Sequence, residues 1–347
     1  MAFKEILFID PVSAKPYTVG SLYKEPMGGT EATVVRIAKA LSKNHVITIA
    51  QASREAAMTD VHGIKYIPFT YNSTNSPVKD VDSVIVIRSN KVLPRVRSQY
   101  PYSRLYLWMH CFPGKHHKQL NKIALKTDTT IITVSDTHQK AVIDFIKKYQ
   151  DHRSYDRKQA KVIRIYNPVD DELKPDGRPV DRNKLVYFSS PHKGLPQVLE
   201  TFSYIRKSIP ELCLYVANPG YMWMKSFPDM EGVINLGALS HGKVIRHVRD
   251  ALCVFYPQSN FRETFGLVFA EANAVGTPVL AHDMGSTPEI LGRNGQLVNA
   301  VYKDEVKAGV QNWRINGRPK VTLHSDFRCS KIAQQWEKIL TTPAINA

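Results

Sequence analysis

The stretch that decides the fold reads FRETFGLVFAEANAVG over Phe261–Gly276 and continues as TPVLAHDMGSTPEIL. Apolar residues recur through it at helical spacing, which predicts a helix over Phe265–Val275 with one face against a core. Gly276 is a typical residue to end this helix, and Pro278 begins a short apolar strand. A helix that leads directly into a buried strand is typical of α/β proteins.

The same alternation of short apolar runs and amphipathic segments extends along the chain in both directions. Predicted strands are Glu5–Ile9, Val46–Ala50, Ser83–Ile87, Ser103–Leu107, Thr130–Val134, Ile163–Tyr166, Leu185–Phe188, Cys213–Val216, Val233–Asn235, Ala251–Phe255 and Pro278–Ala281. Predicted helices between them include Glu31–Ser42, Asp136–Tyr149 and Gly194–Ser208. Strands that are apolar throughout and separated by helices predict parallel sheets buried on both faces.

The length of 347 residues favours two domains at roughly 150 residues each. A Pro-, Gly- and Arg-rich segment follows the strand IRIYN, so we place the boundary near Pro168–Asn183. The predicted fold class is therefore α/β, with two Rossmann-like domains of parallel sheets that face each other across a cleft. The first domain covers residues 1–168 and the second covers 169–325.

The composition narrows the class of protein without defining its function. Hydrophobic residues make up 43% and the net charge is +16, which excludes a disordered or fibrous chain but suits phosphate-bearing ligands, nucleic acid or an anionic membrane. No apolar run approaches the roughly 18 residues of a membrane span, and the N-terminus lacks a secretory pattern. The four cysteines match no zinc or disulfide pattern. We therefore expect a soluble cytoplasmic protein.

Two glutamates stand out within the deciding stretch. Glu263 precedes the predicted helix and Glu271 lies about two turns into it, so they can reach different parts of one ligand. Free backbone N–H groups near Thr264–Leu267 would point at an anion. The alternative is a surface helix with two solvated glutamates.

The whole segment resembles the signature of retaining family-4 glycosyltransferases of the GT-B fold. The resemblance implies that Glu263 contacts the donor sugar and that Glu271 binds the ribose hydroxyls of a nucleotide. It also implies that the backbone amides of the loop bind the diphosphate. These amides belong to Thr264, Phe265, Gly266 and Leu267. The final helix, in residues 326–347, would then return to the N-terminal domain.

A second segment resembles the same family. Val186–Glu200 reads VYFSSPHKGLPQVLE, a strand and loop before a helix. In the family this loop binds the diphosphate, which maps onto Ser189, Ser190 and Lys193. Many relatives carry an arginine about five residues before the Lys-Gly pair, and this chain has serine there, so part of the usual positive charge is missing.

Three shorter segments occupy the order that the family implies. Gly28 and Gly29 precede a helix and would form the N-domain loop over the donor, and their spacing differs from the G-x-G-x-x-G of NAD-binding proteins. His110 ends a predicted strand and would point toward the sugar. A strand-end loop would recognise the nucleotide base through its backbone. This loop contains Gly237, Ala238 and Leu239.

The sequence offers little for a metal site. Asp80-Val81-Asp82 matches the metal-binding Asp-x-Asp of the other glycosyltransferase fold, but it precedes a strand, and we interpret it as a solvated strand entry. The cluster of His116, His117, Lys115 and Lys118 has no carboxylate partner, and we interpret it as a basic acceptor-side loop. We expect no metal and no required cofactor.

The resemblance predicts a retaining glycosyltransferase that moves a sugar from a UDP- or GDP-sugar to a hydroxyl of a glycan, glycoconjugate or lipid-linked acceptor. Glu263, His110 and Lys193 are the candidate catalytic residues. One alternative is a nucleotide-sugar epimerase of the same fold. Another is a basic nucleic-acid-binding protein, although no Arg-dense recognition helix is present. The charged run 147–161 is a candidate for peripheral contact with an anionic membrane or acceptor, or is simply solvated.

Overall fold

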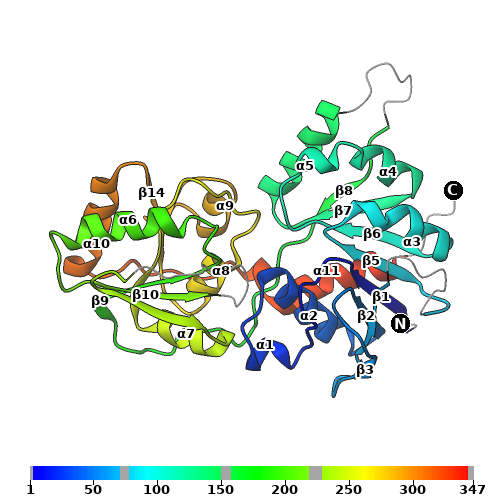
Figure 1. Cartoon of the computed structure of the whole chain (residues 1–347), viewed down its shortest axis with the longest axis horizontal. Coiled ribbons are helices and arrows are strands. Elements are labelled where there is room, and N and C mark those ends of the chain that lie inside the picture. The colour runs from blue at the N-terminus through cyan, green and yellow to red at the C-terminus, as the bar shows by residue number, and fades with distance from the viewer. Residues whose placement is uncertain (1–2, 71–77, 150–157, 219–228, 343–347) are drawn as a thin grey trace. The chain divides into compact units, whose positions relative to one another are not determined.

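The computed structural model describes residues 3–70, 78–149, 158–218 and 229–342. The chain divides into two compact units. Unit 1 comprises residues 1–19, 33–168 and 329–347, and unit 2 comprises residues 20–32 and 169–328. Each unit is built on a sheet that has helices on both of its faces (Figure 1).

The sheet of unit 1 is parallel apart from one edge hairpin. Its order is β3-β4-β2-β1-β5-β6-β7-β8, and only the β3–β4 pair is antiparallel among the described strands. The strands are β1 (Glu5–Asp10), β2 (Val46–Gln51), β3 (Met58–Thr59), β4 (Lys65–Pro68), β5 (Ser83–Ile87), β6 (Arg104–Trp108), β7 (Thr129–Thr133) and β8 (Val162–Arg164). β5 is buried at every position, as expected for a central strand covered on both faces.

The helices of unit 1 bury apolar residues, and α2 is buried at every position from 32 to 38. These helices are α2 (Gly29–Leu41, which begins in unit 2), α3 (Leu93–Gln99), α4 (Leu120–Lys126), α5 (Asp136–Tyr149) and α11 (Cys329–Thr341), with short 3-10 turns η1 (Asn90–Val92) and η2 (Lys115–His117). On α11 the buried residues Ile332, Trp336 and Leu340 are four positions apart, the spacing of one helix face. The ring of Trp336 packs edge-on against Trp108 of β6, with 4.7 Å between ring centroids. This contact fixes the C-terminal helix to unit 1.

The sheet of unit 2 is parallel at every pair of described strands, in the order β11-β10-β9-β12-β13-β14. The strands are β9 (Asp181–Phe188), β10 (Cys213–Asn218), β11 (Val233–Ala238), β12 (Ala251–Tyr256), β13 (Val279–His282) and β14 (Leu297–Val298). The helices are α1 (Ser21–Lys24), α6 (Leu195–Arg206), α7 (His241–Arg249), α8 (Leu267–Ala274), α9 (Thr287–Leu291) and α10 (Lys303–Asn316), with the 3-10 turn η3 (Ser325–Phe327).

The two sheets confirm the predicted α/β class with two Rossmann-like domains. Every residue of β12 is buried, and its neighbours β9 and β13 run parallel to it. The carboxyl ends of these strands therefore lie at one edge of the sheet. This edge is where open α/β sheets bind ligands.

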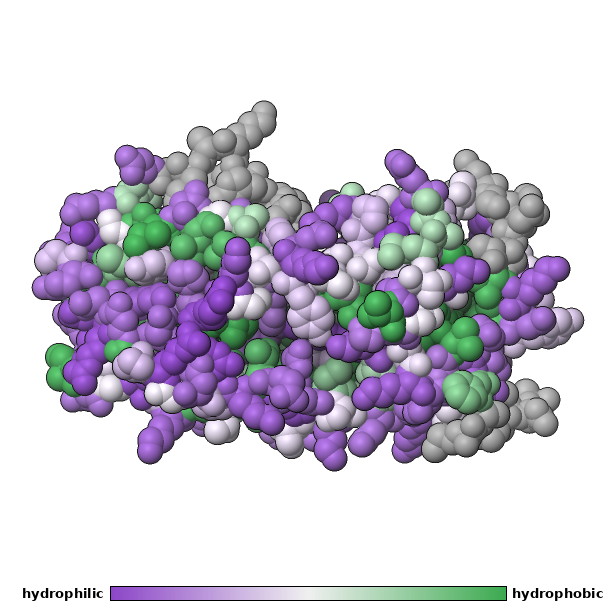
Figure 2. Space-filling view, turned by 90° about the horizontal axis from the view of Figure 1, so that it is seen from below, coloured by the Kyte–Doolittle hydropathy of each residue, from purple (hydrophilic) through white to green (hydrophobic). Residues whose placement is uncertain are grey.

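Within the described residues, no helix combines the length and the apolar character needed to cross a membrane. On the face drawn in Figure 2, apolar side chains are scattered among hydrophilic ones. The charged run 147–161 lies partly outside the described residues, because residues 150–157 are not among them.

His138 on α5 gives unit 1 a pH-dependent contribution to stability. Burial lowers its pKa to about 4 from the ordinary 6.5. In the neutral ring, Nδ1 accepts the backbone N–H of Val134 (3.3 Å) and Nε2 donates to the carbonyl of Cys111 (2.9 Å). Protonation would place a second N–H against the Val134 donor, so the folded state disfavours the charged ring.

The unfolded chain therefore binds this proton more tightly than the folded chain does. The stabilisation is complete above pH 6.5 and is lost as the pH falls toward 4. We expect the free energy of unfolding, measured by urea titration, to drop by up to roughly 3 kcal/mol for this group. His138→Gln should reduce the slope of the free energy of unfolding against pH between pH 4 and 6.5. Substitution of the exposed His62 by Gln should leave that slope unchanged. Identical slopes for the two variants would contradict the expectation.

Candidate functional site

A pocket lies at the carboxyl edge of the unit 2 sheet. It is lined by Met27, Gly29, Ala32, Phe188, Ser189, Ser190, Lys193, Ala217, Asn218, Leu239, His241, Val244, Glu263, Leu267, Val268 and Glu271. The loop after β9, the end of β10 and the first five residues of α8 thus contribute to one concave surface.

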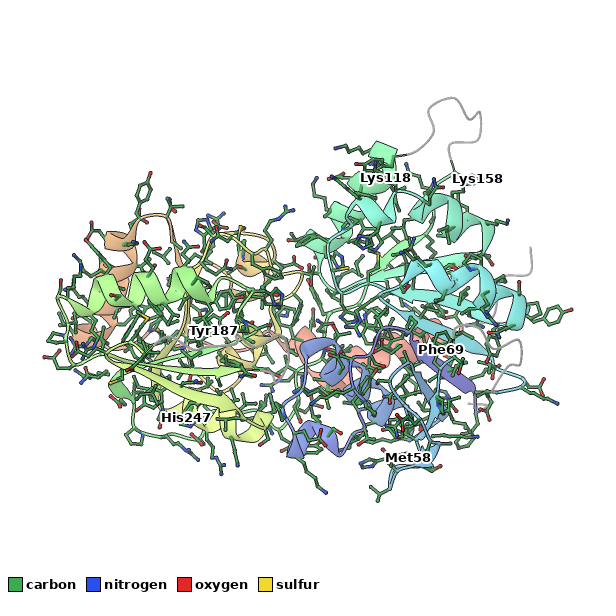
Figure 3. The ribbon with its side chains drawn as sticks, viewed as in Figure 1. Met58, Phe69, Lys118, Lys158, Tyr187 and His247 are labelled. Carbon is green, nitrogen blue, oxygen red and sulfur yellow. The ribbon has the colours of Figure 1, made fainter. Side chains whose placement is uncertain are left out.

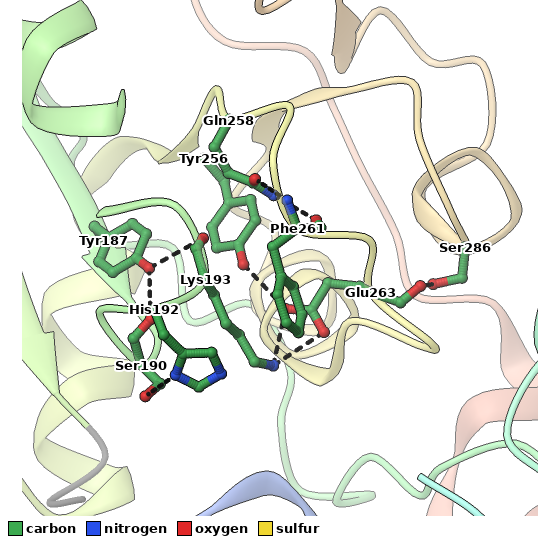
Figure 4. A network of polar contacts seen from close by, with 9 residues as sticks. All are labelled: Tyr187, Ser190, His192, Lys193, Tyr256, Gln258, Phe261, Glu263 and Ser286. Atoms are coloured by element: carbon green, nitrogen blue, oxygen red, sulfur yellow. Dashed lines mark hydrogen bonds and ion pairs between the residues drawn. The ribbon is translucent and has the colours of Figure 1, made fainter. Parts of the chain in front are cut away.

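Lys193 and Glu263 form the central ion pair of this pocket. The ammonium group of Lys193 lies 2.9 and 3.0 Å from the two carboxylate oxygens of Glu263, although the residues are 70 positions apart in sequence (Figure 4). It also lies over the ring of Phe261, at 5.1 Å from the centroid. Glu263 is only 6% exposed. A buried carboxylate requires such a partner, because burial of an unpaired charge is costly.

A hydrogen bond from Tyr256 also holds the Glu263 carboxylate. Its hydroxyl, at the end of β12, donates to Oε1 of Glu263 at 3.0 Å, and its ring stacks on Tyr187 of β9 with centroids 5.5 Å apart. Figure 3 shows Tyr187 among the interior side chains of unit 2, with His247 on α7. Burial, with the Glu263 charge next, raises the pKa of Tyr256 well above its ordinary value, so the hydroxyl remains a donor.

The backbone of Glu263 is also fixed. Its carbonyl accepts the N–H of Ser286 at 3.1 Å and the hydroxyl of Ser286 at 3.0 Å. Gly285 approaches the same carbonyl so closely that an added Cβ would lie 2.8 Å from it. The position of the carboxylate is therefore set from three directions, by Tyr256, Lys193 and Ser286 (Figure 4).

The loop that carries Lys193 packs against the loop after β12. Gly194 adopts φ +89°, and a Cβ on it would lie 2.6 Å from Gln258. Gln258 in turn accepts the backbone N–H groups of Asn260 and Phe261 at 2.9 and 2.8 Å. Only a glycine at position 194 lets the loop after β9 approach Gln258 this closely. The glycine that follows Lys193 therefore allows this loop to pack against the loop after β12.

Ser189 and Ser190 follow the end of β9 and line the pocket beside Lys193. The hydroxyl of Ser190 lies 2.9 Å from Nδ1 of His192, and the Ser190 carbonyl accepts the Tyr187 hydroxyl at 3.0 Å. Burial, with the nearby Lys193 charge, lowers the pKa of His192, so its ring is neutral near pH 7. The serine loop therefore offers hydroxyl groups rather than an additional positive charge.

Helix α8 begins at Leu267, two residues later than predicted from the sequence. Leu267 and Val268 line the pocket, and their backbone N–H groups belong to the first turn, which has no intrahelical acceptors. The buried ring of Phe265 instead packs edge-on against Phe327 at 5.3 Å. The helix N-terminus and Lys193 thus place positive potential on the same pocket.

Gly266 makes this helix start possible. It adopts φ +80°, and a Cβ would lie 2.3 Å from the ring of Phe269. We expect Gly266→Ala to lower the free energy of unfolding by about 3 kcal/mol, from backbone strain plus the clash. Gly295→Ala is the control, since its φ is +73° with open space around the added atom. Strain alone should cost the control about 1 kcal/mol; equal losses in denaturant titrations would rule out the clash.

Glu271 forms a second polar contact in the pocket. It is 3% exposed, and its Oε1 lies 3.0 Å from Nε2 of His241, the first residue of α7. The sequence interpretation did not include His241, because a histidine that starts a charged helix resembles a solvated residue. Both side chains line the pocket, so they present a donor and an acceptor to the same ligand.

The predicted donor-binding residues fall into three groups. Those that line the pocket are Gly29, Ser189, Ser190, Lys193, Leu239, Glu263, Leu267 and Glu271. A second group does not line the pocket but lies one or two positions from a lining residue in sequence. It comprises Gly28, Gly237, Ala238, Thr264, Phe265 and Gly266. His110 belongs to unit 1, where its ring lies 4.8 Å from that of Trp108. Burial, with Arg88 and His138, lowers the pKa of His110 well below its ordinary value.

The Asp-x-Asp motif that the sequence offered as a candidate metal site is engaged in contacts within the protein. Asp82 accepts the Lys4 ammonium group at 2.8 Å and the Glu5 backbone N–H at 2.9 Å, so it closes the entry to β5. In the part of the chain that the structure describes, no three His, Cys, Asp or Glu side chains form a group able to hold a metal ion.

Solved structures with the same architecture cover nearly the whole chain. Sucrose-phosphate synthase from Thermosynechococcus elongatus aligns with a TM-score of 0.65 at 14% identity, covering 97% of this chain and 98% of its own. An α,α-trehalose-phosphate synthase (UDP-forming) from Burkholderia xenovorans aligns at 0.68 and 10% identity, with coverage of 97% and 100%. A glycosyltransferase from Rickettsia africae aligns at 0.60 and 14% identity, with coverage of 97% and 98%. The search of curated proteins finds no match.

The two sheets and the pocket at the carboxyl edge of the second one define a protein of the GT-B fold. Residues 170–319, which contain this pocket apart from its Met27, Gly29 and Ala32 wall, match the model of the family described as Glycosyl transferases group 1.

Proposed function

We propose that the chain is a retaining glycosyltransferase that takes a sugar from a nucleotide-diphosphate sugar, UDP- or GDP-linked, and transfers it to an acceptor hydroxyl. The observation that carries the proposal is the ion pair of Lys193 with the buried carboxylate of Glu263, beside the start of α8. A cation, a carboxylate and unpaired first-turn amides at one edge of a pocket match the needs of a diphosphate leaving group.

In the proposed reaction the bond between the anomeric carbon and the phosphate oxygen breaks, and the acceptor oxygen bonds to that carbon from the same face. The acceptor proton passes to the departing phosphate. Negative charge develops on the phosphate, where Lys193 and the amides of Leu267 and Val268 stabilise it. These groups supply positive charge from the protein itself, so we propose that no divalent ion is required.

Glu263 has a different role in this proposal. When Lys193 turns toward the phosphate, Glu263 keeps the hydrogen bond from Tyr256 and can accept from a sugar hydroxyl. It then orients the sugar and stabilises positive charge that develops at the anomeric carbon. Glu271, at the other side of the pocket, accepts from the ribose hydroxyls, with His241 adjacent to it.

The names of two proteins with the same fold support a nucleotide-diphosphate sugar as the donor. The trehalose-phosphate synthase is UDP-forming by name, and a pneumococcal O-GlcNAc transferase, aligned at a TM-score of 0.58 and 16% identity, holds UDP and GlcNAc. Nucleotide-diphosphate sugars are therefore the first donors to test.

A ligand screen followed by product analysis tests the proposal. UDP or GDP, and the matching sugar donors, should raise the melting temperature, because they bind only the folded chain. With a stabilising donor and candidate acceptors, nuclear magnetic resonance should show a product with the anomeric configuration of the donor, also in the presence of EDTA. An inverted product would contradict retention, and loss of turnover in EDTA would contradict metal independence. Donor-derived sugar that is epimerised without an acceptor would indicate the epimerase instead.

A further inference from the structure

The positive charge of the chain is concentrated in one of its two units. Unit 1 contains 27 Lys and Arg against 12 Asp and Glu, whereas unit 2 contains 20 against 19. The difference is +15 for unit 1 and +1 for unit 2, which together account for the total of +16. The pocket described above, which lies in unit 2, therefore explains little of the excess.

A large share of this charge lies on the helices α4 and α5 and the segment before β8. We call the set the α4–α5 basic surface. Its members are Lys118, Lys122, Lys126, Lys147, Lys148 and Lys158, and all six are exposed. Lysines this exposed contribute little to folding, so their gathering in one region calls for an external partner.

Contacts between the elements show that these lysines share one region. The ring of Tyr149, at the end of α5, lies beneath the ammonium groups of both Lys118 (5.5 Å) and Lys148 (5.6 Å). Asn121 of α4 donates to the carbonyl of Lys158 at 3.2 Å. Figure 3 shows Lys118 and Lys158 at the same end of unit 1.

Two of the acidic side chains near this surface are engaged in ion pairs. Asp144 on α5 pairs with Lys140 at 2.7 Å, and Asp136 at the start of α5 pairs with Arg164 at 3.0 Å. The exposed Asp128 lies beyond the end of α4. The surface therefore keeps a strongly positive potential, which favours an anionic partner.

Apolar side chains accompany the lysines. Leu125 is 42% exposed and Tyr149 is 38% exposed. Leu125 follows Lys122 by three positions on α4, so both lie on one side of the helix. The combination of exposed lysines with an aliphatic and an aromatic side chain matches the interface of a bilayer, where charged heads meet phosphates and apolar groups enter the headgroup layer.

We propose that the α4–α5 basic surface docks unit 1 on a membrane that contains anionic phospholipids. A nucleic acid would be expected to meet arginines and several stacking aromatic rings in a groove, whereas the members of this surface are lysines around the single ring of Tyr149. A soluble anionic glycan would gain little from exposed Leu125. The docking is independent of the transfer reaction proposed for unit 2, so it can be tested without any activity measurement.

Vesicle co-sedimentation of the full chain tests the docking. The protein should pellet with vesicles of phosphatidylcholine mixed with phosphatidylglycerol, and should remain in the supernatant with phosphatidylcholine alone. Added sodium chloride should release it, because exposed charges are screened. Changing Lys118, Lys122, Lys147 and Lys148 to Gln should lower the partition coefficient by on the order of 100-fold or more, since each lysine near the surface contributes about fivefold.

A charge-matched control separates this surface from net charge. Changing the exposed Lys43, Lys65, Lys79 and Lys331 to Gln removes the same charge from unit 1 at other positions. This control should keep most of the binding, and both variants should melt near the wild-type temperature. Equal loss in the two variants would overturn the assignment to α4–α5. So would equal binding to neutral vesicles, or capture of an oligonucleotide in preference to anionic vesicles.

Discussion

Lys193→Ala is expected to lower kcat by on the order of 10²- to 10³-fold, the usual loss when one preorganised charge-stabilising donor is removed. In the unliganded protein this ammonium group holds both oxygens of Glu263. In the proposed reaction it turns to the leaving phosphate. The variant should still bind the acceptor, so the loss should appear in kcat more than in KM, measured in steady-state assays with the donor found by the ligand screen.

The same substitution also leaves a buried carboxylate without its cation, and this effect must be separated from the catalytic one. Removing one partner of a buried pair is expected to cost about 3 kcal/mol of stability. The double variant Lys193→Ala with Glu263→Gln removes the uncompensated charge, so it should regain much of that stability without regaining turnover. If the double variant recovered both, Lys193 would serve only to neutralise Glu263.

Lys184→Ala provides the matched control. Lys184 of β9 is a buried lysine of unit 2, and it pairs with the partly exposed Asp250 at 2.6 Å. Its loss should reduce stability, while kcat of the folded fraction stays at the wild-type value. A comparable drop in kcat for Lys184→Ala would show that the assay reports stability rather than chemistry.

The fold was predictable because its signals are local. Buried strands such as β5 and β12 are short apolar runs, and α5 has an apolar period that defines both of its ends. Helices α3 and α4 were not predicted, since seven residues give too few turns for a period to appear. α7 was missed because HGKVIRHVR buries only three residues among five charged or histidine side chains.

The candidate site was predictable only in part, and for a physical reason. Motifs indicated Lys193 and Glu263 separately, but sequence does not show that residues 70 positions apart form an ion pair. Tyr256 reads as one more apolar residue at the end of a buried strand, and its hydroxyl has meaning only beside Glu263. The roles carried over from the family resemblance remain predictions, including that of His110.

Glu271→Ala is expected to raise the Kd for the nucleoside diphosphate by on the order of 100-fold, since a carboxylate that accepts from hydroxyls contributes about 1.5–3 kcal/mol per bond. Glu271 is nearly buried at the pocket wall, 3.0 Å from His241, so its position is fixed before the ligand binds. Isothermal titration calorimetry measures the change. Glu200→Gln is the control, because that exposed glutamate pairs with Lys303 away from the pocket.

A comparison with 2′-deoxy and 3′-deoxy nucleotides shows whether the lost contact is to the ribose. The wild-type chain should bind the deoxy ligands more weakly than the ribonucleotide, while Glu271→Ala should bind all of them with similar affinity, because the partner of the missing hydroxyl is already gone. Such non-additivity is the mark of a direct contact. If the variant still discriminated against the deoxy ligands as strongly as the wild type, Glu271 would act on another part of the ligand. His241→Ala should give a smaller loss that follows the same pattern, because His241 positions the carboxylate and the carboxylate itself remains.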